Sequence, residues 1–520
     1  MKRIVSVLIL LCFLVAAYAD GEVIEIWTKE QLKEVRDAVN NGTDNFSGKT
    51  VRLMADLDID GGWTPIGTID DEAHSFKGTF DGQGNTINIS VTGSSTVLGL
   101  FGYFRGTVEN LKVTGKVLNT EKENTSSTAG IVAYNRGTIS ECANMATIQG
   151  TIAGGIAGEN HGTITNCYHQ GNIYATSEYG AYYLGGIAGI ENGVSISNVY
   201  AFCGQMDNVS STGGIVATNQ SGTLLSKCFY DVKLDGMSEM SGSTSLVGDA
   251  LKSSFNNSIW TFTEGELPEL TCFKNKIVRL SDNNDNSDIL TSYNNQTCTV
   301  ELSGRTLYKD GKWNTLCLPF DVDDISSSPL AGATIKEMDG TKTNLDSNGK
   351  LTLKFNTATS IEAGKPYIIM WEPGTDLDNV QFSGVTIDNT GPTPVTFSNA
   401  FGGDGQFVGT YSPFGITSGN IDEIVLLSDA NKLGYSKNPR TLRSCRAHFM
   451  IPTSSSGIRA MVDFDIDFNG GESTGVAALN DNGEMIHDND GWYTLTGVKL
   501  DGKPTRRGIY LHNGRKEAVK

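Results

Sequence analysis

Three aspartates near the start of the chain have the spacing of a cation-binding strand. Asp56, Asp58 and Asp60 alternate with Leu57 and Ile59, and alternate residues of a β-strand lie on the same face. Three carboxylates on one face could bind Ca²⁺ or take part in acid–base chemistry on a polysaccharide. A calcium loop counted from Asp56 would need Glu at its twelfth position, where the sequence has Gly. We therefore predict a solvated strand face and no cofactor, with Ca²⁺ binding as the alternative.

Three basic residues occupy matching positions in a repeated turn. Arg105, Arg136 and His161 each stand directly before a Gly-Thr pair, so in a stacked repeat fold they would lie above one another as a basic ridge. Such a ridge could contact an anionic glycan or a host surface protein. The alternative is that they are ordinary exposed polar residues, which turns normally carry beside glycine.

A cluster of tyrosines around residue 180 is the third candidate site. Tyr174, Tyr179, Tyr182 and Tyr183 fall within a longer insertion, residues 174–184, which is typical of a projecting loop. Exposed tyrosine rings form an apolar platform on which sugar rings can stack. The alternative places several of these rings in the interior of the fold.

The sequence lacks the common catalytic signatures. It has no His-Glu-x-x-His zinc motif and no Gly-x-Ser-x-Gly nucleophile elbow. The spacing from Gly497 to Gly502 and Lys503 matches a phosphate-binding loop, but Pro504 replaces the hydroxyl residue that would hold Mg²⁺. A binding protein is therefore favoured over an enzyme, and a polysaccharide lyase or glycoside hydrolase of the β-helix type is the alternative.

All three candidate sites lie on or beside a repeat. Five tetrapeptides that begin with glycine recur 25 to 31 residues apart, and each precedes a turn and a short apolar strand. They are Gly99–Gly102, Gly130–Ala133, Gly155–Gly158, Gly186–Gly189 and Gly214–Ala217. The apolar runs are short and show no helical periodicity, so each repeat predicts one coil of a parallel β-helix, about 4.8 Å from the next. Residues 51–59 and 78–91 predict two earlier coils.

The cysteines fit this stacking. Cys142 and Cys167 hold matching places in adjacent repeats, as expected if equivalent side chains form ladders along the coils. Eight cysteines follow the predicted signal segment. In an exported protein they can form disulfides, or remain buried thiols that pack as small apolar groups, and the sequence leaves both possibilities open.

A short helix is predicted to cover the first coil. The segment Thr28–Gln31 forms a capping box, and Leu32, Val35 and Val39 line one face, which predicts an amphipathic helix over residues 28–40. A solenoid needs such a cover because its end exposes unpaired strand edges.

At these residues the chain resembles a known family. The segments Trp27–Leu32, Trp63–Gly67 and Phe76–Gly84 resemble the opening of GLUG-motif bacterial surface proteins, and the repeated tetrapeptides resemble the GLUG motif itself. Trp260 and the following Gly265–Pro268 resemble the closing segment of that family. The resemblance covers residues 24–270. It implies a right-handed parallel β-helix on a bacterial surface with an adhesin-like role, and no established reaction.

The second half predicts another all-β unit. Between residues 276 and 470, apolar runs of strand length alternate with turn residues, which favours a β-sandwich. The segment Gly304–Phe320 resembles an accessory domain that recurs in secreted Bacteroidetes proteins, and Ala363–Tyr367 fits the same pattern. The polar run Asp282–Asp288 is predicted to link the two halves.

The last residues, 475–520, predict a small β tail. The segments Trp492–Leu500 and Gly508–Leu511 resemble the C-terminal sorting tails of exported Bacteroidetes proteins. The resemblance implies that the type IX export machinery of the outer membrane is a partner. A plain terminal hairpin is the alternative.

The leader and the charge predict where the protein acts. Lys2 and Arg3 precede an apolar run that ends in Ala17–Ala19, so residues 1–19 predict a cleaved secretory signal peptide. No apolar run is long enough for a transmembrane helix. A net charge of -19 over 520 residues argues against a nucleic-acid partner.

Together these patterns predict an exported, extracellular or cell-surface protein of the all-β class. We expect a β-helix over residues 20–270, a β-sandwich over 276–470 and the β tail. The favoured function is adhesin-like binding of a glycan or a host-matrix ligand. A structural stalk without a ligand is a further alternative.

Overall fold

The structure is a computed structural model in which the chain is all-β. It describes residues 21–59, 61–122, 126–176, 182–207, 209–230, 254–263, 266–347, 350–427 and 433–452, and the backbone of several further strands. The predicted signal peptide lies outside the described residues. The chain divides into two compact units, Met1–Lys276 (unit 1) and Ile277–Lys520 (unit 2).

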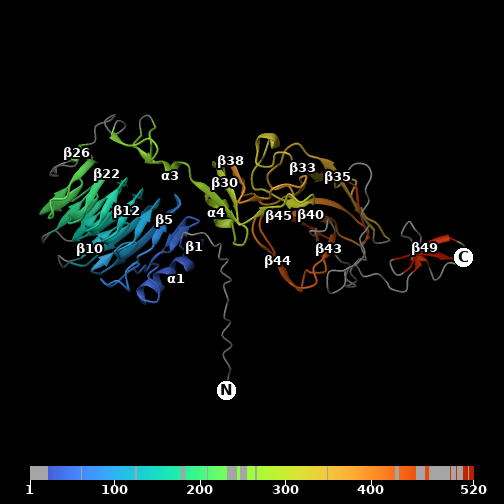
Figure 1. Cartoon of the computed structure of the whole chain (residues 1–520), viewed down its shortest axis with the longest axis horizontal. Coiled ribbons are helices and arrows are strands. Elements are labelled where there is room, and N and C mark those ends of the chain that lie inside the picture. The colour runs from blue at the N-terminus through green and yellow to red at the C-terminus, as the bar shows by residue number, and fades with distance from the viewer. Residues whose placement is uncertain are drawn as a thin grey trace, which may run out of the picture. The chain divides into compact units, whose positions relative to one another are not determined.

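Unit 1 is a parallel β-solenoid of about seven coils (Figure 1). One coil consists of β10 (Ser127–Ala129), β11 (Val132–Asn135), β12 (Thr138–Ser140), β13 (Ala143–Asn144) and β14 (Thr147–Gly150). Each strand pairs in parallel with its counterpart in the next coil, which comprises β15 (Ile152–Gly154), β16 (Ala157–Asn160), β17 (Thr163–Thr165), β18 (Tyr168–His169) and β19 (Ile173–Ala175). The predicted β-helix is therefore confirmed.

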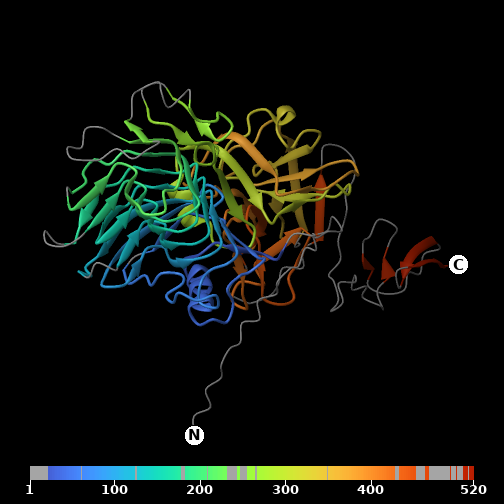
Figure 2. The ribbon, with the colours of Figure 1, turned by 60° about the vertical axis from the view of Figure 1, so that its left-hand side comes forward.

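The other strands of unit 1 extend the same rows, which lie side by side in Figure 2. They are β1 (Val23–Ile26), β2 (Thr50–Leu53), β3 (Leu57–Ile59), β4 (Thr79–Asp81), β5 (Thr86–Gly93), β6 (Val97–Leu98), β7 (Phe101–Phe104), β8 (Thr107–Glu109), β9 (Lys112–Asn119), β20 (Tyr183–Gly185), β21 (Ala188–Glu191), β22 (Ser195–Ala201), β23 (Ser211–Gly213), β24 (Val216–Asn219), β25 (Leu225–Tyr230) and β26 (Ser243–Ser245). Two rows have five strands each, β6-β10-β15-β20-β23 and β7-β11-β16-β21-β24. The longer β5, β9 and β22 belong to a 16-stranded sheet that forms the rest of the coil.

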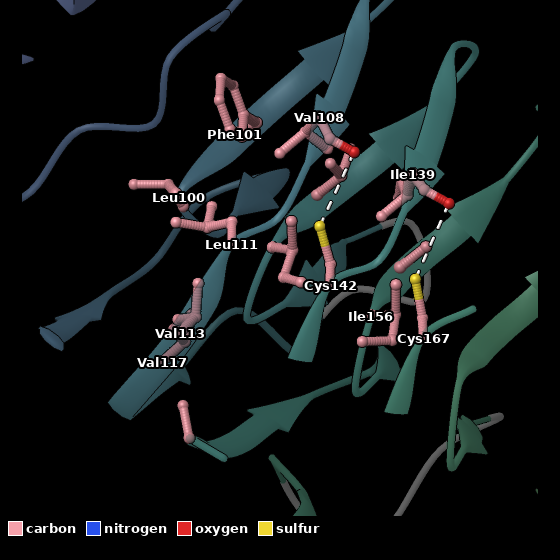
Figure 3. Close-up of a cluster of buried hydrophobic side chains, with 14 of the residues drawn as sticks. Leu100, Phe101, Val108, Leu111, Val113, Val117, Ile139, Cys142, Ile156 and Cys167 are labelled. Carbon is pink, nitrogen blue, oxygen red and sulfur yellow. Dashed lines mark hydrogen bonds between the residues drawn. The ribbon is translucent and has the colours of Figure 1, made fainter. Parts of the chain in front are cut away.

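The interior of the solenoid is built from rows of equivalent apolar side chains. Val108, Ile139 and Ile164 pair in register from coil to coil and are fully buried. A second row contains Cys142 and Cys167, whose thiols point toward backbone oxygens at 3.7 Å (Figure 3). No disulfide links the eight cysteines of the described residues. Cys142 and Cys167 are fully buried in the apolar core and pack as small apolar groups.

In four of the five repeats the first glycine is required by a close approach across the coil. An added Cβ would lie 2.2 to 2.5 Å from a side chain on the β13, β18, β22 or β25 strand, which is far inside van der Waals contact. The pairs are Gly130 with Asn144, Gly155 with His169, Gly186 with Ala201 and Gly214 with Tyr230. The glycine of the motif therefore sets the narrow cross-section of the solenoid.

Five of the coils also bend at one residue with a left-handed backbone. These residues have φ between 50° and 54°, and each directly precedes an inward-facing residue of the row that contains Cys142. They are Asn110, Glu141, Asn166, Asn198 and Lys227. Asparagine tolerates this conformation better than other residues with a side chain, which explains why it fills three of the five positions.

Two segments outside the coils cover the solenoid. Helix α1 (Lys29–Asn40) begins with the predicted capping box, and its buried face joins the solenoid core. The later segment, with β27 (Trp260–Thr261), β28 (Glu269–Leu270) and α3 (Thr271–Lys274), packs on the outer side of the row from β13 to β25. There the ring centres of Trp260 and Tyr200 are 5.7 Å apart. The Tyr200 hydroxyl donates a hydrogen bond to the Pro268 carbonyl at 2.6 Å.

Unit 2 consists of a long mixed sheet with smaller sheets packed on it. The eleven-stranded sheet contains β32 (Asn314–Leu316), β33 (Thr334–Met338), β34 (Asn344–Leu345), β35 (Lys350–Thr357), β36 (Tyr367–Met370), β39 (Val395–Asn399), β40 (Gly405–Thr410), β42 (Ile424–Leu427), β43 (Leu433–Tyr435), β45 (Arg446–Met450) and β46 (Asp463–Asp467). Tyr367 and Ile369 of β36 face one core, which also contains residues of the three-stranded sheet of β29 (Ile277–Ser281), β30 (Thr297–Ser303) and β38 (Gln381–Thr386). Ile368 faces a second core on the other side. This two-layered packing agrees with the predicted sandwich.

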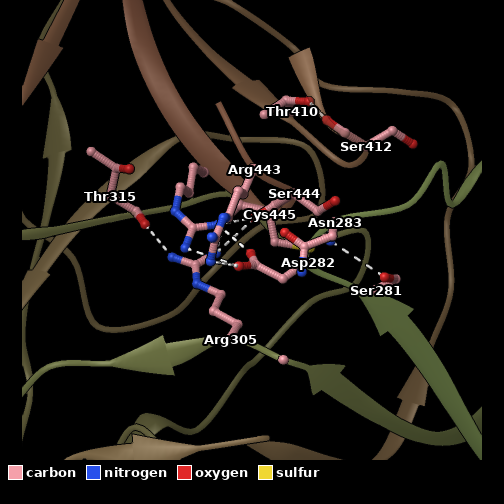
Figure 4. A network of polar contacts seen from close by, with 12 residues as sticks. Ser281, Asp282, Asn283, Arg305, Thr315, Thr410, Ser412, Arg443, Ser444 and Cys445 are labelled. Carbon is pink, nitrogen blue, oxygen red and sulfur yellow. Dashed lines mark hydrogen bonds and ion pairs between the residues drawn. The ribbon is translucent and has the colours of Figure 1, made fainter. Parts of the chain in front are cut away.

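The predicted linker is wrong. Residues 282–288 lie inside unit 2, and Asp282 is only 2% exposed. Its carboxylate accepts hydrogen bonds from Arg446 and, at 3.3 Å, from Arg443 (Figure 4). Arg305 is also buried there and donates to the Thr315 carbonyl at 2.5 Å. The run therefore begins with a buried ion network at Asp282, and the boundary between the units falls at Lys276 instead.

The C-terminal residues form a separate small sheet. It has four antiparallel strands in the order β48-β47-β49-β50, namely β48 (Lys499–Leu500), β47 (Trp492–Tyr493), β49 (Gly508–His512) and β50 (Arg515–Val519). The predicted small β tail is therefore present, with more strands than a single hairpin would have.

Candidate functional site

The outer surface of the β7-β11-β16 row carries a ladder of aromatic and charged side chains. Tyr103, Tyr134 and Glu159 pair in register in three consecutive coils and face outward between buried neighbours. Two residues further along, the turn that follows each strand carries a basic side chain. We call this surface the coil ladder; it consists of Tyr103, Arg105, Tyr134, Arg136, Glu159 and His161.

The turn residues of the coil ladder stack as the repeat spacing predicts. The Arg136 amide donates to the Phe104 carbonyl at 2.8 Å, and the His161 amide donates to the Asn135 carbonyl at 2.7 Å. These bonds hold the turn of each coil against the turn of the coil before it. The side chains of Arg105, Arg136 and His161 consequently lie in consecutive coils on the same side of the solenoid.

The rings of the coil ladder pack against one another. The ring centres of Tyr103 and Tyr134 are 5.4 Å apart, and those of Tyr134 and His161 are 4.7 Å apart with an angle of 19° between the planes. Their spacing matches the distance of about 4.8 Å between neighbouring strands. Tyr134 and His161 therefore cover a face of each other, whereas Tyr103 is tilted by 52° against Tyr134. This arrangement suits hydrogen bonding better than stacking of a sugar ring.

One carboxylate shares the two arginines. Asp70, which lies in the connection between β3 and β4, accepts from Arg105 at 2.8 Å and from Arg136 at 3.0 Å. Arg136 also lies 5.2 Å from the centre of the Tyr134 ring, and its hydrogen bond to the Tyr134 hydroxyl raises its pKa. The side chain of Arg136 is 39% exposed, so it can still donate to a ligand.

The coil ladder is consequently less basic than the sequence suggested. Asp70 and Glu159 offset the charges of the two arginines, and the Glu159 carboxylate lies 3.4 Å from the His161 ring nitrogen. The surface offers closely spaced donors and acceptors rather than a strongly positive stripe. Tyr103 and Tyr134 could have been found from the sequence, because each follows the last residue of its repeated tetrapeptide directly. Asp70 could not, because it lies in a non-repeated connection.

The predicted tyrosine platform does not form as expected. Tyr182 is 1% exposed, so its ring is unavailable to a ligand, and this prediction is wrong for a simple reason: the ring is needed in the packing of the coil. Tyr183 is half-buried in β20, whereas Tyr174 lies in β19 and donates to Gln205 at 3.1 Å. These two side chains belong to different rows. Tyr179 lies outside the described residues.

The predicted aspartate face is engaged in contacts within the protein. The Asp56 carboxylate accepts from the Thr86 amide and from the Lys276 ammonium group, both at 2.6 Å. Asp58 accepts from Asn88 at 3.0 Å, and Asp60 lies outside the described residues. No group of three or more His, Cys, Asp or Glu side chains with metal-binding geometry occurs in the described part of the chain.

The described fold and site define the class of the chain: a β-solenoid protein with a second all-β unit. No family model matches the sequence, and no curated protein matches it. Among solved structures, the chain is similar to a crystal structure titled a "putative immunoglobulin A1 protease" from Bacteroides ovatus. The two share 20% sequence identity with a TM-score of 0.37, over 48% of this chain and 92% of that one. A similarity this low assigns no activity to this chain.

Proposed function

We propose that the protein is exported to the cell surface, where its solenoid binds a glycan or a host-matrix ligand in an adhesin-like manner. The coil ladder is the observation that carries this proposal. It repeats polar and charged side chains at one-coil intervals along an exposed, regularly paired surface. A linear array suits an extended polymer better than a compact molecule, because successive units of the polymer can reach successive coils.

The expected mechanism is multivalent hydrogen bonding. Arg136 and Tyr134 supply donors, and Glu159 supplies an acceptor, in neighbouring coils. A single hydrogen bond exchanged with water contributes only about 0.5–1.5 kcal/mol. Useful affinity therefore requires several coils to bind one ligand together, so that each further contact forms at a high effective concentration.

Export is part of the proposal and rests on the ends of the sequence. Residues 1–19 would direct secretion, and residues 475–520 would engage type IX sorting machinery, to whose tails they are similar. The antiparallel sheet of β47 to β50 supports a role for these residues as a separate β tail. Cleavage after Ala19 predicts that the mature chain begins at Asp20.

A search of the described helices finds none that is long and apolar enough to cross a membrane.

The test uses the mature protein from Asp20 onward on an immobilised panel of glycans and host-matrix proteins. Bound protein and released sugar are both measured, for the wild type, for Arg136→Ala and for Lys227→Ala. Lys227 is an exposed cation on β25, outside the coil ladder, and serves as the matched control. We expect the wild type and the control to be retained equally, and Arg136→Ala to bind about 3- to 10-fold more weakly.

Three outcomes would contradict the proposal. Equal retention of Arg136→Ala would remove the coil ladder as the binding surface. Release of oligosaccharide would favour a lyase or hydrolase and return attention to Asp56 and Asp58. No retention of any variant on any surface would favour a structural stalk without a ligand.

A further inference from the structure

Unit 2 contains a cavity that none of the predicted sites includes. Its volume is about 390 Å³, within the range of roughly 300–1,000 Å³ that is typical of small-molecule sites. One wall is the face of β40 and β45 that carries Val408 and His448. Residues of α4 (Ser287–Ser292) and of the connection 389–392 form the other walls.

The strand pattern explains why a histidine faces this cavity. In β45, Ala447 and Phe449 are 2% exposed and belong to the core on the other side of the sheet. His448 lies between them, so its side chain points to the opposite face. It pairs in register with Val408 of β40, and Phe414 stacks on its ring with the two centres 4.7 Å apart. The ring is therefore held in place beside the cavity, which His448 lines.

The imidazole of His448 has unsatisfied hydrogen-bonding groups. The residue is 2% exposed, yet neither ring nitrogen has a hydrogen-bond partner among the described residues. Burial lowers the pKa of His448 to about 4, so the ring is neutral at physiological pH and offers one donor and one acceptor. Leaving such groups unpaired costs about 1–3 kcal/mol each, which a ligand with complementary groups would recover.

The walls of the cavity indicate the chemistry of that ligand. Among the described residues that line it there is no Asp, Glu, Lys or Arg, so an uncharged ligand is favoured. Leu290, Pro392 and Val408 supply apolar surface, whereas Thr291 and Asn389 supply polar groups near the same space. A ligand with hydroxyl groups around its edge and C–H groups on its face matches both kinds of wall.

We propose that this cavity binds a single neutral sugar ring. A hydroxyl of the ring pairs with a ring nitrogen of His448, and its C–H face packs against Leu290 and Val408. The site is independent of the coil ladder, because all of its residues belong to unit 2. Its failure would leave the proposal for the solenoid unaffected.

Ligand-observed saturation-transfer NMR on the full mature protein tests this directly. The probes are methyl α-glucoside, methyl α-galactoside and N-acetylglucosamine, with glucuronate as a charged comparator and benzyl alcohol as an apolar one. We expect at least one neutral sugar to bind in the millimolar range typical of a single ring. We expect glucuronate to bind at least about tenfold more weakly, because its carboxylate would be desolvated without a cation.

Two variants locate the site, and a third is the control. His448→Phe keeps a flat ring under Phe414 and removes both nitrogens, and it should weaken binding at least about tenfold. Thr291 is exposed at the rim, so Thr291→Phe should block the cavity without disturbing the fold. Thr334→Phe makes the same change at an exposed position of β33, away from the lining residues, and should bind as the wild type does.

Several results would overturn the proposal. The first is the absence of saturation transfer to every neutral sugar, which would mean that the cavity holds solvent only. The second is binding of benzyl alcohol in place of the sugars. The third is sugar binding that survives both His448→Phe and Thr291→Phe. Thermal unfolding of each variant confirms that a loss of binding is not a loss of fold.

Discussion

A buried histidine in each unit shows how differently the two units treat polar groups. In unit 1, His169 lies in a row of equivalent positions, and its Nδ1 atom is 2.9 Å from the Asn144 carbonyl of the previous coil, so that only its Nε2 atom lacks a partner among the described residues. In unit 2, His448 has no equivalent residue in a neighbouring strand and no partner for either nitrogen among the described residues. Burial lowers the pKa of both residues to about 4.

The difference follows from repetition. A solenoid places the same position of the next coil about 4.8 Å away, so a buried polar side chain meets an equivalent one. Asn135 donates to Asn160 at 2.6 Å, and Asn160 donates to Glu191 at 2.7 Å in the following coil. Sites in such a fold are linear and repeated. The non-repeating sheet of unit 2 allows single features instead, such as the Asp282 network and the His448 cavity.

The largest expected effect is on the unique network of unit 2. Asp282→Asn removes the carboxylate that pairs with Arg443 and Arg446, and should lower the free energy of unfolding of unit 2 by about 3–5 kcal/mol. Chemical unfolding followed by intrinsic fluorescence measures this. The control is Asp404→Asn, at an exposed aspartate. If the stability of unit 2 is unchanged, the network is not the internal support that its burial suggests.

A single glycine of the repeat should have the next largest effect. In Gly155→Ala the new Cβ would lie 2.2 Å from the His169 ring, so the coil must widen, at a cost of about 1–3 kcal/mol. Gly93→Ala is the matched control, because no atom lies within 4 Å of its added Cβ. Thermal unfolding of unit 1 compares them. Equal stabilities of the two variants would show that glycine in the motif does not set the cross-section.

Glu191 gives the solenoid a pH-dependent stability. Burial raises its pKa, so the folded state binds the proton more tightly than the unfolded state does. The free energy of unfolding is therefore greatest below the ordinary carboxyl pKa, and falls as pH rises from there through the raised folded-state pKa. Glu191→Asn introduces the residue type that the two preceding coils have at the equivalent positions, Asn135 and Asn160. It should remove this slope and stabilise unit 1 at neutral pH by about 1 kcal/mol.

The measurement is urea unfolding of the wild type and of Glu191→Asn from pH 4 to pH 8, a range chosen to span the carboxyl titration. Parallel curves for the two proteins would mean that Glu191 does not titrate in the folded solenoid. The sequence itself marks this position, because Glu191 stands where the preceding repeats have Asn135 and Asn160.

The smallest expected effect is at the left-handed corners. Lys227 has φ of 52°, and Lys227→Asn should raise the stability of unit 1 by about 0.5–1 kcal/mol, because asparagine adopts this conformation more readily. Lys116→Asn, in the extended strand β9, should give no gain. Differential scanning calorimetry resolves a stability difference of this size. Higher stability of both variants would mean that the gain comes from the removed charge rather than from backbone conformation.

Repetition also decided what the sequence could predict. Residue spacing predicted the coils and the capping helix over residues 28–40. It also predicted the stacking of Arg105, Arg136 and His161, because equivalent residues of a repeat occupy equivalent places in successive coils. Asp70 was missed because it lies in a connection without copies. The prediction that the Tyr182 side chain is exposed was wrong because an insertion interrupts the repeat there. The spacing therefore no longer shows whether the side chain points inward or outward.

In unit 2 the sequence predicted strands and little else. His448 has no repeated partner in the sequence, and the cavity it faces is lined by segments more than 150 residues apart, from Ser287 to Met450. The run at residues 282–288 was misread as a linker because the sequence does not distinguish the buried Asp282 from the mostly exposed polar residues that follow it. Only the structure shows that Asp282 forms an ion pair with Arg446.

The central claim is that the solenoid binds along its length whereas unit 2 binds a single ring. It is tested by measuring affinity against oligosaccharide length, from one sugar upward, for the wild type, Arg136→Ala and His448→Phe. We predict that affinity rises with oligosaccharide length in the wild type and in His448→Phe. In Arg136→Ala we predict that this rise is lost, whereas the binding of a single sugar is retained. An affinity independent of length, or the same loss in both variants, would contradict the account.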